Sequence, residues 1–148
     1  MPLDDPRSAA FRVFNEIGII NQLATAILAR RLPDGLHPSQ FSLLGNLVRL
    51  GDGKTPAMLA AAFQVPKPSM TNTLMQLEKR ALITVETHPD DLRKKVVYLT
   101  DAGREVYRGV IAAMDAPLRD VIGQVEGVTD MLPTLEQLRR VLDDNRDV

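Results

Sequence analysis

The sequence contains no cysteine and no tryptophan, and its aromatic residues are limited to four phenylalanines and two tyrosines. The absence of cysteine excludes disulfides, thiolate catalysis and cysteine-ligated zinc. No apolar run approaches the ~20 residues that a membrane-spanning helix needs. The first residues, MPLDDPRSAAF, carry acids where a secretory signal would carry bases. We therefore expect a cytoplasmic protein without a membrane segment.

Sequence patterns of catalysis and metal binding are also missing. The chain has no glycine-rich phosphate loop, no Ser-His-Asp order and no His-x-x-x-His spacing. His37 and His88 are far apart and have no neighbouring ligands at metal-binding spacing, so both are interpreted as exposed or loop histidines. The sequence favours a protein that is not an enzyme and has no metal site and no cofactor.

What the chain does contain is enough apolar sequence for one compact domain, because 45% of its 148 residues are hydrophobic. The net charge of −1 is distributed unevenly. Residues 54–95 hold seven bases against four acids, so this segment carries +3 and the remainder −4. Such a segment could approach a polyanion with one face only, although an ordinary solvated surface would give the same count.

Helical periodicity covers most of the chain. Apolar residues recur at spacings of three and four from Ser8 to about Arg31, and a second helix is expected from Pro38 to Leu50. Thr55 and Pro56 begin a short third helix, because threonine caps a helix well and proline is tolerated in its first turn. The expected buried side chains of this helix are Met58, Leu59, Ala62 and Phe63.

The fourth predicted helix, from Lys67 to about Arg80, follows the three-residue break Gln64-Val65-Pro66. At 100° per residue it has a core-facing arc of Met70, Leu74, Leu77 and Ala81. The opposite arc is polar and lacks glutamate: Ser69, Asn72, Gln76 and Lys79. This arrangement is typical of a helix-turn-helix whose second helix enters a major groove. Asn72 and Gln76 could bond the adenine edge, contact phosphate, or be surface polar residues only.

Two strands rich in β-branched residues follow, ITVETH and KVVYLT, with Pro89, Asp90 and Asp91 between them as turn residues. Ile83 and Val85 alternate with polar neighbours, as in a half-buried hairpin. A hairpin directly after a recognition helix is a wing, and its bases Arg93, Lys94 and Lys95 could reach phosphate or the minor groove. In isolation the same three bases would indicate a solvated turn.

The strings TPAMLAAAF, SMTNTLMQLEKRALI and DDLRKKVVYLTDAGR, in this order between flanking helices, resemble the MarR family of winged-helix transcriptional regulators. The resemblance covers nearly the whole chain and is strongest from Leu36 to Arg104. It implies a mainly α fold with a small β-hairpin wing. Residues 1–148 would then form one domain, with dimerisation helices at 8–32 and 104–146 and a winged helix-turn-helix lobe at 36–100.

The resemblance also assigns roles to individual residues. The wing arginine matching Arg93 would enter or border the minor groove, and Asp91 would hold it through a charge-assisted contact. Thr55 would support the helix-turn-helix, and the expected DNA-binding residues are Lys67, Ser69, Thr71, Asn72, Gln76 and Lys79 on the helix and Arg93, Lys94 and Lys95 on the wing, with Asp91 as the residue that positions Arg93. Two positions depart from the pattern: Ala81 replaces a glycine, which weakens the expectation of a left-handed helix end, and Pro66 replaces a serine or threonine cap.

The last third of the chain is predicted to be helical and to take part in dimerisation. Thr100 caps a helix with Asp101 in its first turn, and a kink is expected at Pro117. Its apolar stripe continues to Val125, and a final helix presents further apolar residues: Leu135, Leu138, Val141 and Leu142. The terminal helices hold more apolar surface than a small core covers, which favours pairing with a second copy.

The function predicted from sequence is a homodimeric, ligand-responsive repressor that binds double-stranded DNA at a pseudo-palindromic operator. The alternative is a winged-helix dimer that has lost DNA binding and serves as a protein-interaction module. The resemblance implies a small aromatic or phenolic effector, but its binding residues stay unknown. Asn15, His37 and Arg49 are conceivable polar contacts for it, and Met114, otherwise core filler, is a conceivable lining residue.

Overall fold

The computed structural model describes residues 6–146 and is mainly helical, as the sequence predicted. In chain order the elements are α1 (Pro6–Ala29), α2 (Pro38–Leu50), α3 (Pro56–Phe63), α4 (Lys67–Lys79), β1 (Ile83–Thr87), β2 (Lys95–Leu99), α5 (Asp101–Ile122), a 3₁₀ turn at Thr129–Met131 and α6 (Leu132–Asp144). The chain divides into two compact units within α5, between Ile111 and Ala112. No helix among residues 6–146 is long and apolar enough to span a membrane.

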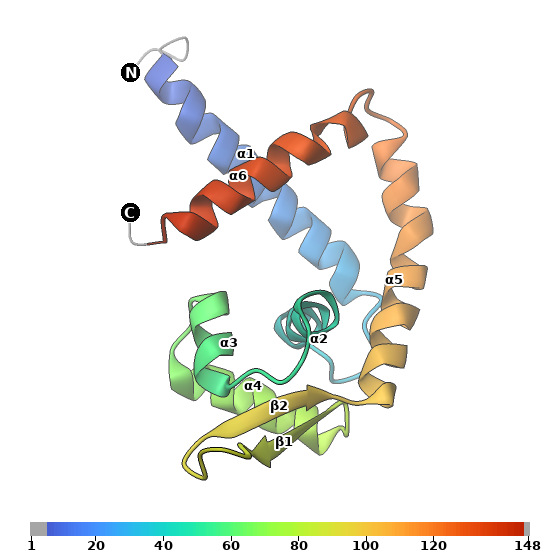
Figure 1. Ribbon diagram of the computed structural model, residues 1–148. Helices are drawn as coiled ribbons and strands as arrows, with labels where there is room; N and C mark the ends of the chain where they lie inside the picture. Colours follow the sequence, from blue (N-terminus) through green and yellow to red (C-terminus); the bar gives the residue numbers. More distant parts are fainter. Residues whose placement is uncertain (1–5, 147–148) are drawn as a thin grey trace. The chain divides into compact units, whose positions relative to one another are not determined.

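The core of the first unit lies where α2, α3, α4 and the hairpin come together (Figure 1). Its fully buried side chains come from the three helices and from both strands of the hairpin: Leu43, Leu44, Leu47, Leu59, Leu77, Ile83 and Val97. Each fully buried aliphatic side chain contributes roughly 1.5–3 kcal/mol relative to the exposed state. This core fixes the helix-turn-helix and the wing as one body.

The start of α3 forms as predicted, but its buried face is different. Thr55 Oγ1 accepts a hydrogen bond from the Met58 backbone N–H at 3.2 Å, and Pro56 occupies the first turn. Leu59 and Ala60 are buried, whereas Met58 is 56% exposed and Ala62 is exposed. The prediction for Met58 and Ala62 was wrong because an eight-residue helix has too few turns to define its apolar face from sequence.

The end of α4 also differs from the expectation, because the helix stops at Lys79 and Ala81 is exposed, not in the buried arc. Ala81 has φ +57°, and two hydrogen bonds close the helix: Ala81 N–H to Glu78 O at 2.8 Å and Leu82 N–H to Leu77 O at 3.1 Å. This is a Schellman motif, which glycine ordinarily completes. The left-handed end therefore forms despite the alanine.

The wing is an antiparallel hairpin in which Ile83 pairs with Leu99 and Thr87 with Lys95. Both strands end one residue before the predicted His88 and Thr100. The alternation is confirmed, since Ile83 is buried, Val85 is half-buried and Thr84 and Glu86 are exposed. Lys54 adds an isolated bridge to β2, where the Val97 N–H donates to Lys54 O at 2.8 Å. The base of the wing is thus tied to the segment that leads into α3.

The first turn of α5 packs closely against the wing. Thr100 Oγ1 accepts from the Gly103 N–H at 3.0 Å and donates to Ala81 O at 2.7 Å, which confirms the predicted cap. The helix assignment continues through Pro117 to Ile122, so Val125 lies beyond it. Nearby, Phe41 of α2 stacks on Tyr107 of α5 with ring centroids 5.1 Å apart.

Large apolar side chains remain exposed in both units. On α1, Phe11 is 72% and Leu23 63% exposed. In the second unit α6 contains no buried residue, and Leu132, Leu135, Val141 and Leu142 are all exposed. These side chains are therefore only partly covered by the rest of the described chain.

Candidate nucleic-acid interface

The exposed face of α4 carries the polar side chains that the helical wheel indicated. Met70, Leu74 and Leu77 are buried against the core, which turns five predicted contact residues to the surface: Ser69, Thr71, Asn72, Gln76 and Lys79. Met75 lies among them and is 62% exposed. Pro66 precedes the helix without a side-chain cap. The α4 surface can offer hydrogen bonds, and a lysine at each end of the helix, to a ligand.

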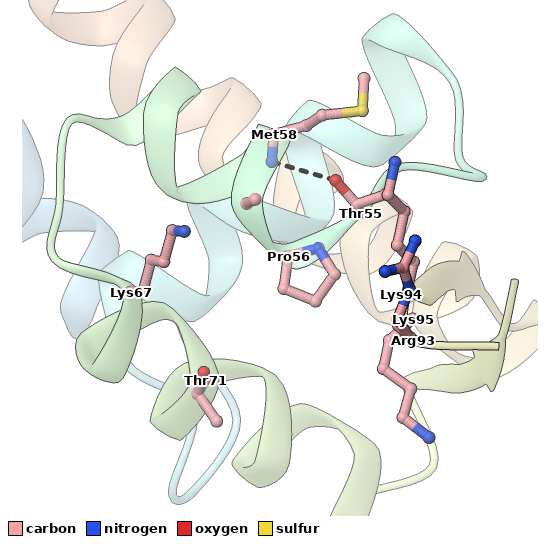
Figure 2. Close-up of a pocket in the computed structure, with 9 residues that line it drawn as sticks. Thr55, Pro56, Met58, Lys67, Thr71, Arg93, Lys94 and Lys95 are labelled. Carbon is pink, nitrogen blue, oxygen red and sulfur yellow. Dashed lines mark hydrogen bonds between the residues drawn. The ribbon is translucent and has the colours of Figure 1, made fainter. Parts of the chain in front are cut away.

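A cleft of about 440 Å³ lies beside this face, where the starts of α3 and α4 meet the wing. Its lining consists of Thr55, Pro56, Ala57, Met58, Lys67, Thr71, Arg93, Lys94 and Lys95, none of them acidic. Figure 2 shows Pro56 between Lys67 on one side and the wing bases on the other. The fold therefore gathers residues from three separate stretches of sequence into one cationic concavity.

Six of the residues predicted from sequence line this cleft: Thr55, Lys67, Thr71, Arg93, Lys94 and Lys95. Four others on α4 (Ser69, Asn72, Gln76 and Lys79) are exposed outside it. The conceivable effector contacts Asn15, His37, Arg49 and Met114 do not line it either. Among the described residues no cluster of three or more His, Asp or Glu side chains could hold a metal ion.

Asp91 and Arg93 form a local clamp at the tip of the wing. Arg93 Nε donates to Asp91 Oδ1 at 3.1 Å and Arg93 Nη2 to Oδ2 at 3.4 Å, while the Arg93 backbone N–H donates to Oδ1 at 3.0 Å. The side-chain hydrogen bonds from Arg93, followed by the backbone one, hold the pKa of Asp91 below its ordinary value of 3.8. The predicted contact between the two residues is present, although the Arg93 side chain remains 90% exposed.

Sequence reasoning missed Gln40, a buried polar residue in the first turn of α2. Gln40 is 2% exposed. Its Oε1 accepts from the His37 backbone N–H at 3.0 Å, and its Nε2 donates to Gln76 Oε1 on α4. The spacing His37-x-x-Gln40 before an apolar run was the available signal, since a capping box places glutamine at this position. The contact with α4 had no signal in the sequence.

The fold and this surface define a winged helix-turn-helix protein. The sequence model of the MarR family matches residues 34–94, the stretch that contains the helix-turn-helix, β1 and the turn of the wing and ends just before β2. Over this stretch the chain is similar to the MarR family, in agreement with the resemblance found in the sequence.

Solved structures share the fold over nearly the whole chain. The transcriptional regulator BldR from Sulfolobus solfataricus is 20% identical with a TM-score of 0.78, covering 92% of this chain and 98% of BldR. Streptococcus pneumoniae FabT, solved in complex with DNA, is 19% identical with a TM-score of 0.70, covering 91% and 98%. The PcaV transcriptional regulator from Streptomyces coelicolor, solved with its natural ligand, is 18% identical with a TM-score of 0.67, covering 97% and 96%.

Proposed function

We propose that this protein is a homodimeric, sequence-specific DNA-binding transcriptional regulator that represses by occluding a promoter. The observation that carries the proposal is the cationic cleft, because Lys67, Arg93, Lys94 and Lys95 converge there without an acid although the whole chain is slightly acidic. Phosphate binding supplies most non-specific affinity for DNA, and clustered bases provide it. FabT, which has the same fold, has been solved with DNA bound.

In this proposal α4 lies in the major groove and the wing reaches the backbone or the adjacent minor groove. Ser69, Asn72 and Gln76 face the base edges and the outer phosphates, with Lys79 at the helix end. Lys67 and Thr71 bind phosphate at the cleft, together with the wing bases. Asp91 orients Arg93 through the clamp and does not itself contact DNA. Contacts with base edges then provide sequence specificity, and phosphate contacts at the cleft fix the position of the protein on the duplex.

The proposed homodimer accounts for the exposed apolar side chains of α1 and α6. Side chains such as Phe11 and Leu132 are more than half exposed, and exposed apolar side chains gathered in a patch can mark an interface. A second copy related by a two-fold axis would present a second α4. The operator would then be a pseudo-palindrome with half-sites about 10 base pairs apart, or a multiple of that spacing.

Ligand control is proposed on the fold alone. PcaV, solved with its natural ligand, has the same fold, and a small aromatic or phenolic effector fits the family resemblance. Such an effector would release the operator by binding one arrangement of the dimer more tightly than the other. The structure assigns no residues to that site.

Titration of duplex DNA at several salt concentrations tests the proposal. Affinity should fall steeply with salt, because each phosphate contact releases counterions. Arg93→Ala should weaken binding to all duplexes alike and reduce the salt slope by about 1. Arg49→Ala is the matched control, because this arginine is exposed at the end of α2 and does not line the cleft; without an effector it should leave binding unchanged.

Asn72→Ala tests the base-reading surface separately. It should reduce discrimination between operator and random duplex while non-specific affinity persists. If the parent binds no duplex at low salt, the protein-interaction module becomes the better interpretation. If Arg93→Ala and Asn72→Ala both bind the operator as tightly as the parent, the assigned contact surface is wrong.

A further inference from the structure

Gln40 connects the start of α2 to the recognition helix through a relay of two hydrogen bonds. The His37 backbone N–H donates to Gln40 Oε1 at 3.0 Å. Gln40 Nε2 then donates to Gln76 Oε1. The relay lies in the first unit of the chain, and Gln40 is 2% exposed while Gln76 is exposed. A buried amide is therefore the immediate neighbour of a proposed DNA-reading amide.

The direction of this relay is determined by its first member. A backbone N–H can only donate, so the atom of Gln40 that faces His37 must be the oxygen. Gln40 then presents its NH₂ group to Gln76, and the atom of Gln76 that faces it must again be the oxygen. If the Gln76 amide were flipped, its NH₂ group would face the NH₂ group of Gln40. If the Gln40 amide were flipped, its NH₂ group would face the His37 N–H, and a buried donor without an acceptor is costly.

Gln76 consequently directs its oxygen at Gln40 and turns its NH₂ group to the exposed side. Within residues 6–146 its Nε2 makes no hydrogen bond. In the major groove guanine offers the two acceptors N7 and O6, and thymine offers O4. Adenine offers the acceptor N7 beside its N6–H₂ donor, and cytosine offers only a donor. Bidentate recognition of adenine requires an amide oxygen as well as an NH₂ group. That oxygen keeps a second lone pair but is directed at Gln40, so Gln76 meets a base through its NH₂ group and the bidentate contact with adenine, one of the roles left open by the sequence, is disfavoured.

We propose that Gln40 is a specificity-determining residue that never touches DNA: by holding the Gln76 oxygen, it makes Gln76 select guanine or thymine. This inference rests on the proposed DNA-binding function. Gln40 is a positioning residue, and its effect should appear in base preference before it appears in overall affinity.

Selection from a pool of random-sequence duplexes tests the proposal. Comparison of the parent with Gln76→Ala identifies the base position that depends on Gln76. At that position the parent should prefer guanine or thymine by about tenfold over cytosine, the size of one well-made base contact. An adenine preference in the parent, or identical preferences in the parent and Gln76→Ala, would overturn the proposal.

Gln40→Glu reverses the relay. One carboxylate oxygen still accepts from His37, and the other accepts from Gln76, whose NH₂ group must then turn inward. The exposed Gln76 oxygen should shift the preference to the donor-bearing bases cytosine and adenine. An unchanged guanine or thymine preference in a folded Gln40→Glu protein would contradict the relay.

Gln40→Leu is a second test of the proposal. It applies if circular dichroism shows that the buried carboxylate of Gln40→Glu prevents folding. Leucine fills the site without orienting Gln76, so adenine should become as acceptable as guanine at the same position. Retention of the parent preference by Gln40→Leu would count against the proposal. If the parent bound no duplex at all, the proposed DNA-binding function itself would be refuted. Failure of the Gln40 proposal can therefore be distinguished from failure of the proposed function.

Discussion

Asp91 is an acid at the tip of a basic wing, and its contacts explain why its charge does not oppose the proposed function. The carboxylate accepts from the Arg93 side chain and from the Arg93 backbone N–H. It thereby limits the orientations of an arginine that is otherwise 90% exposed. Preorganising a long side chain reduces the entropy lost when it binds.

The clamp gives a pH prediction at residue scale. Because the folded pKa of Asp91 lies below 3.8, its contribution to stability is complete above the unfolded pKa and is lost as pH falls through the lower folded value. Carbon-detected NMR titration of the Asp91 carboxyl should show this low pKa, and Arg93→Ala should return it toward 3.8. An unchanged pKa in Arg93→Ala would mean that Arg93 does not bind the carboxylate in solution.

Ala81 holds the left-handed helix end that glycine would occupy more easily. Ala81→Gly should stabilise the protein by about 1 kcal/mol, because the φ of +57° strains a residue that has a β-carbon. Denaturant unfolding measures the change. Ala62→Gly in α3 is the matched control and should destabilise by a similar amount, since glycine disfavours a helix interior. If Ala81→Gly destabilised the protein as Ala62→Gly does, the backbone at Ala81 would not be strained.

At the scale of elements, the first turn of α5 is held against the hairpin by a glycine. A β-carbon at Gly103 would lie 2.2 Å from Leu82 O and 2.8 Å from Leu99 Cδ1. The glycine in the stretch Leu99 to Gly103 therefore permits the close approach of α5 to the start of β1. No sequence periodicity indicates that requirement.

Gly103→Ala should accordingly destabilise the fold by about 1–3 kcal/mol, as overpacking does. Gly109→Ala is the matched control in the same helix, because a β-carbon there meets no atom within 4 Å in the described chain. It should stabilise by up to about 1 kcal/mol through helix propensity. Thermal unfolding of both variants measures these effects, and equal melting temperatures would show that the contact with Leu82 is absent.

Most elements could be predicted from sequence because specific residues, chiefly proline and glycine, mark where helices begin and end. The bounds of α2 were predicted as Pro38 to Leu50 and are observed there, because proline begins the helix and Gly51 ends it. The buried side of α4 was likewise predictable at Met70, Leu74 and Leu77, since thirteen residues define a periodicity. The relay from Gln40 to Gln76 could not be predicted, because 36 residues separate the two amides and only the packing of α2 on α4 brings them together.

At the scale of the whole molecule, the exposed apolar side chains should affect operator affinity, because they are proposed to hold the homodimer together. A single winged-helix lobe would contact one half-site, whereas a dimer binds the second half-site as an intramolecular event with high effective concentration. Weakening the dimer should therefore lower operator affinity without altering the reading surface. The salt slope of the remaining complex should also decrease, because fewer phosphates are contacted.

Phe11→Asp tests this coupling, because Phe11 is 72% exposed on α1 and its replacement removes no contact of the chain's own core. We expect sedimentation velocity to show a monomer at concentrations where the parent is a dimer, since a charge at an apolar interface is costly to desolvate. Operator affinity should fall by at least tenfold in parallel. Leu92→Asp is the control: Leu92 is 82% exposed on the wing, so this variant should remain dimeric. A dimeric Phe11→Asp protein with full operator affinity would exclude this part of α1 from the interface.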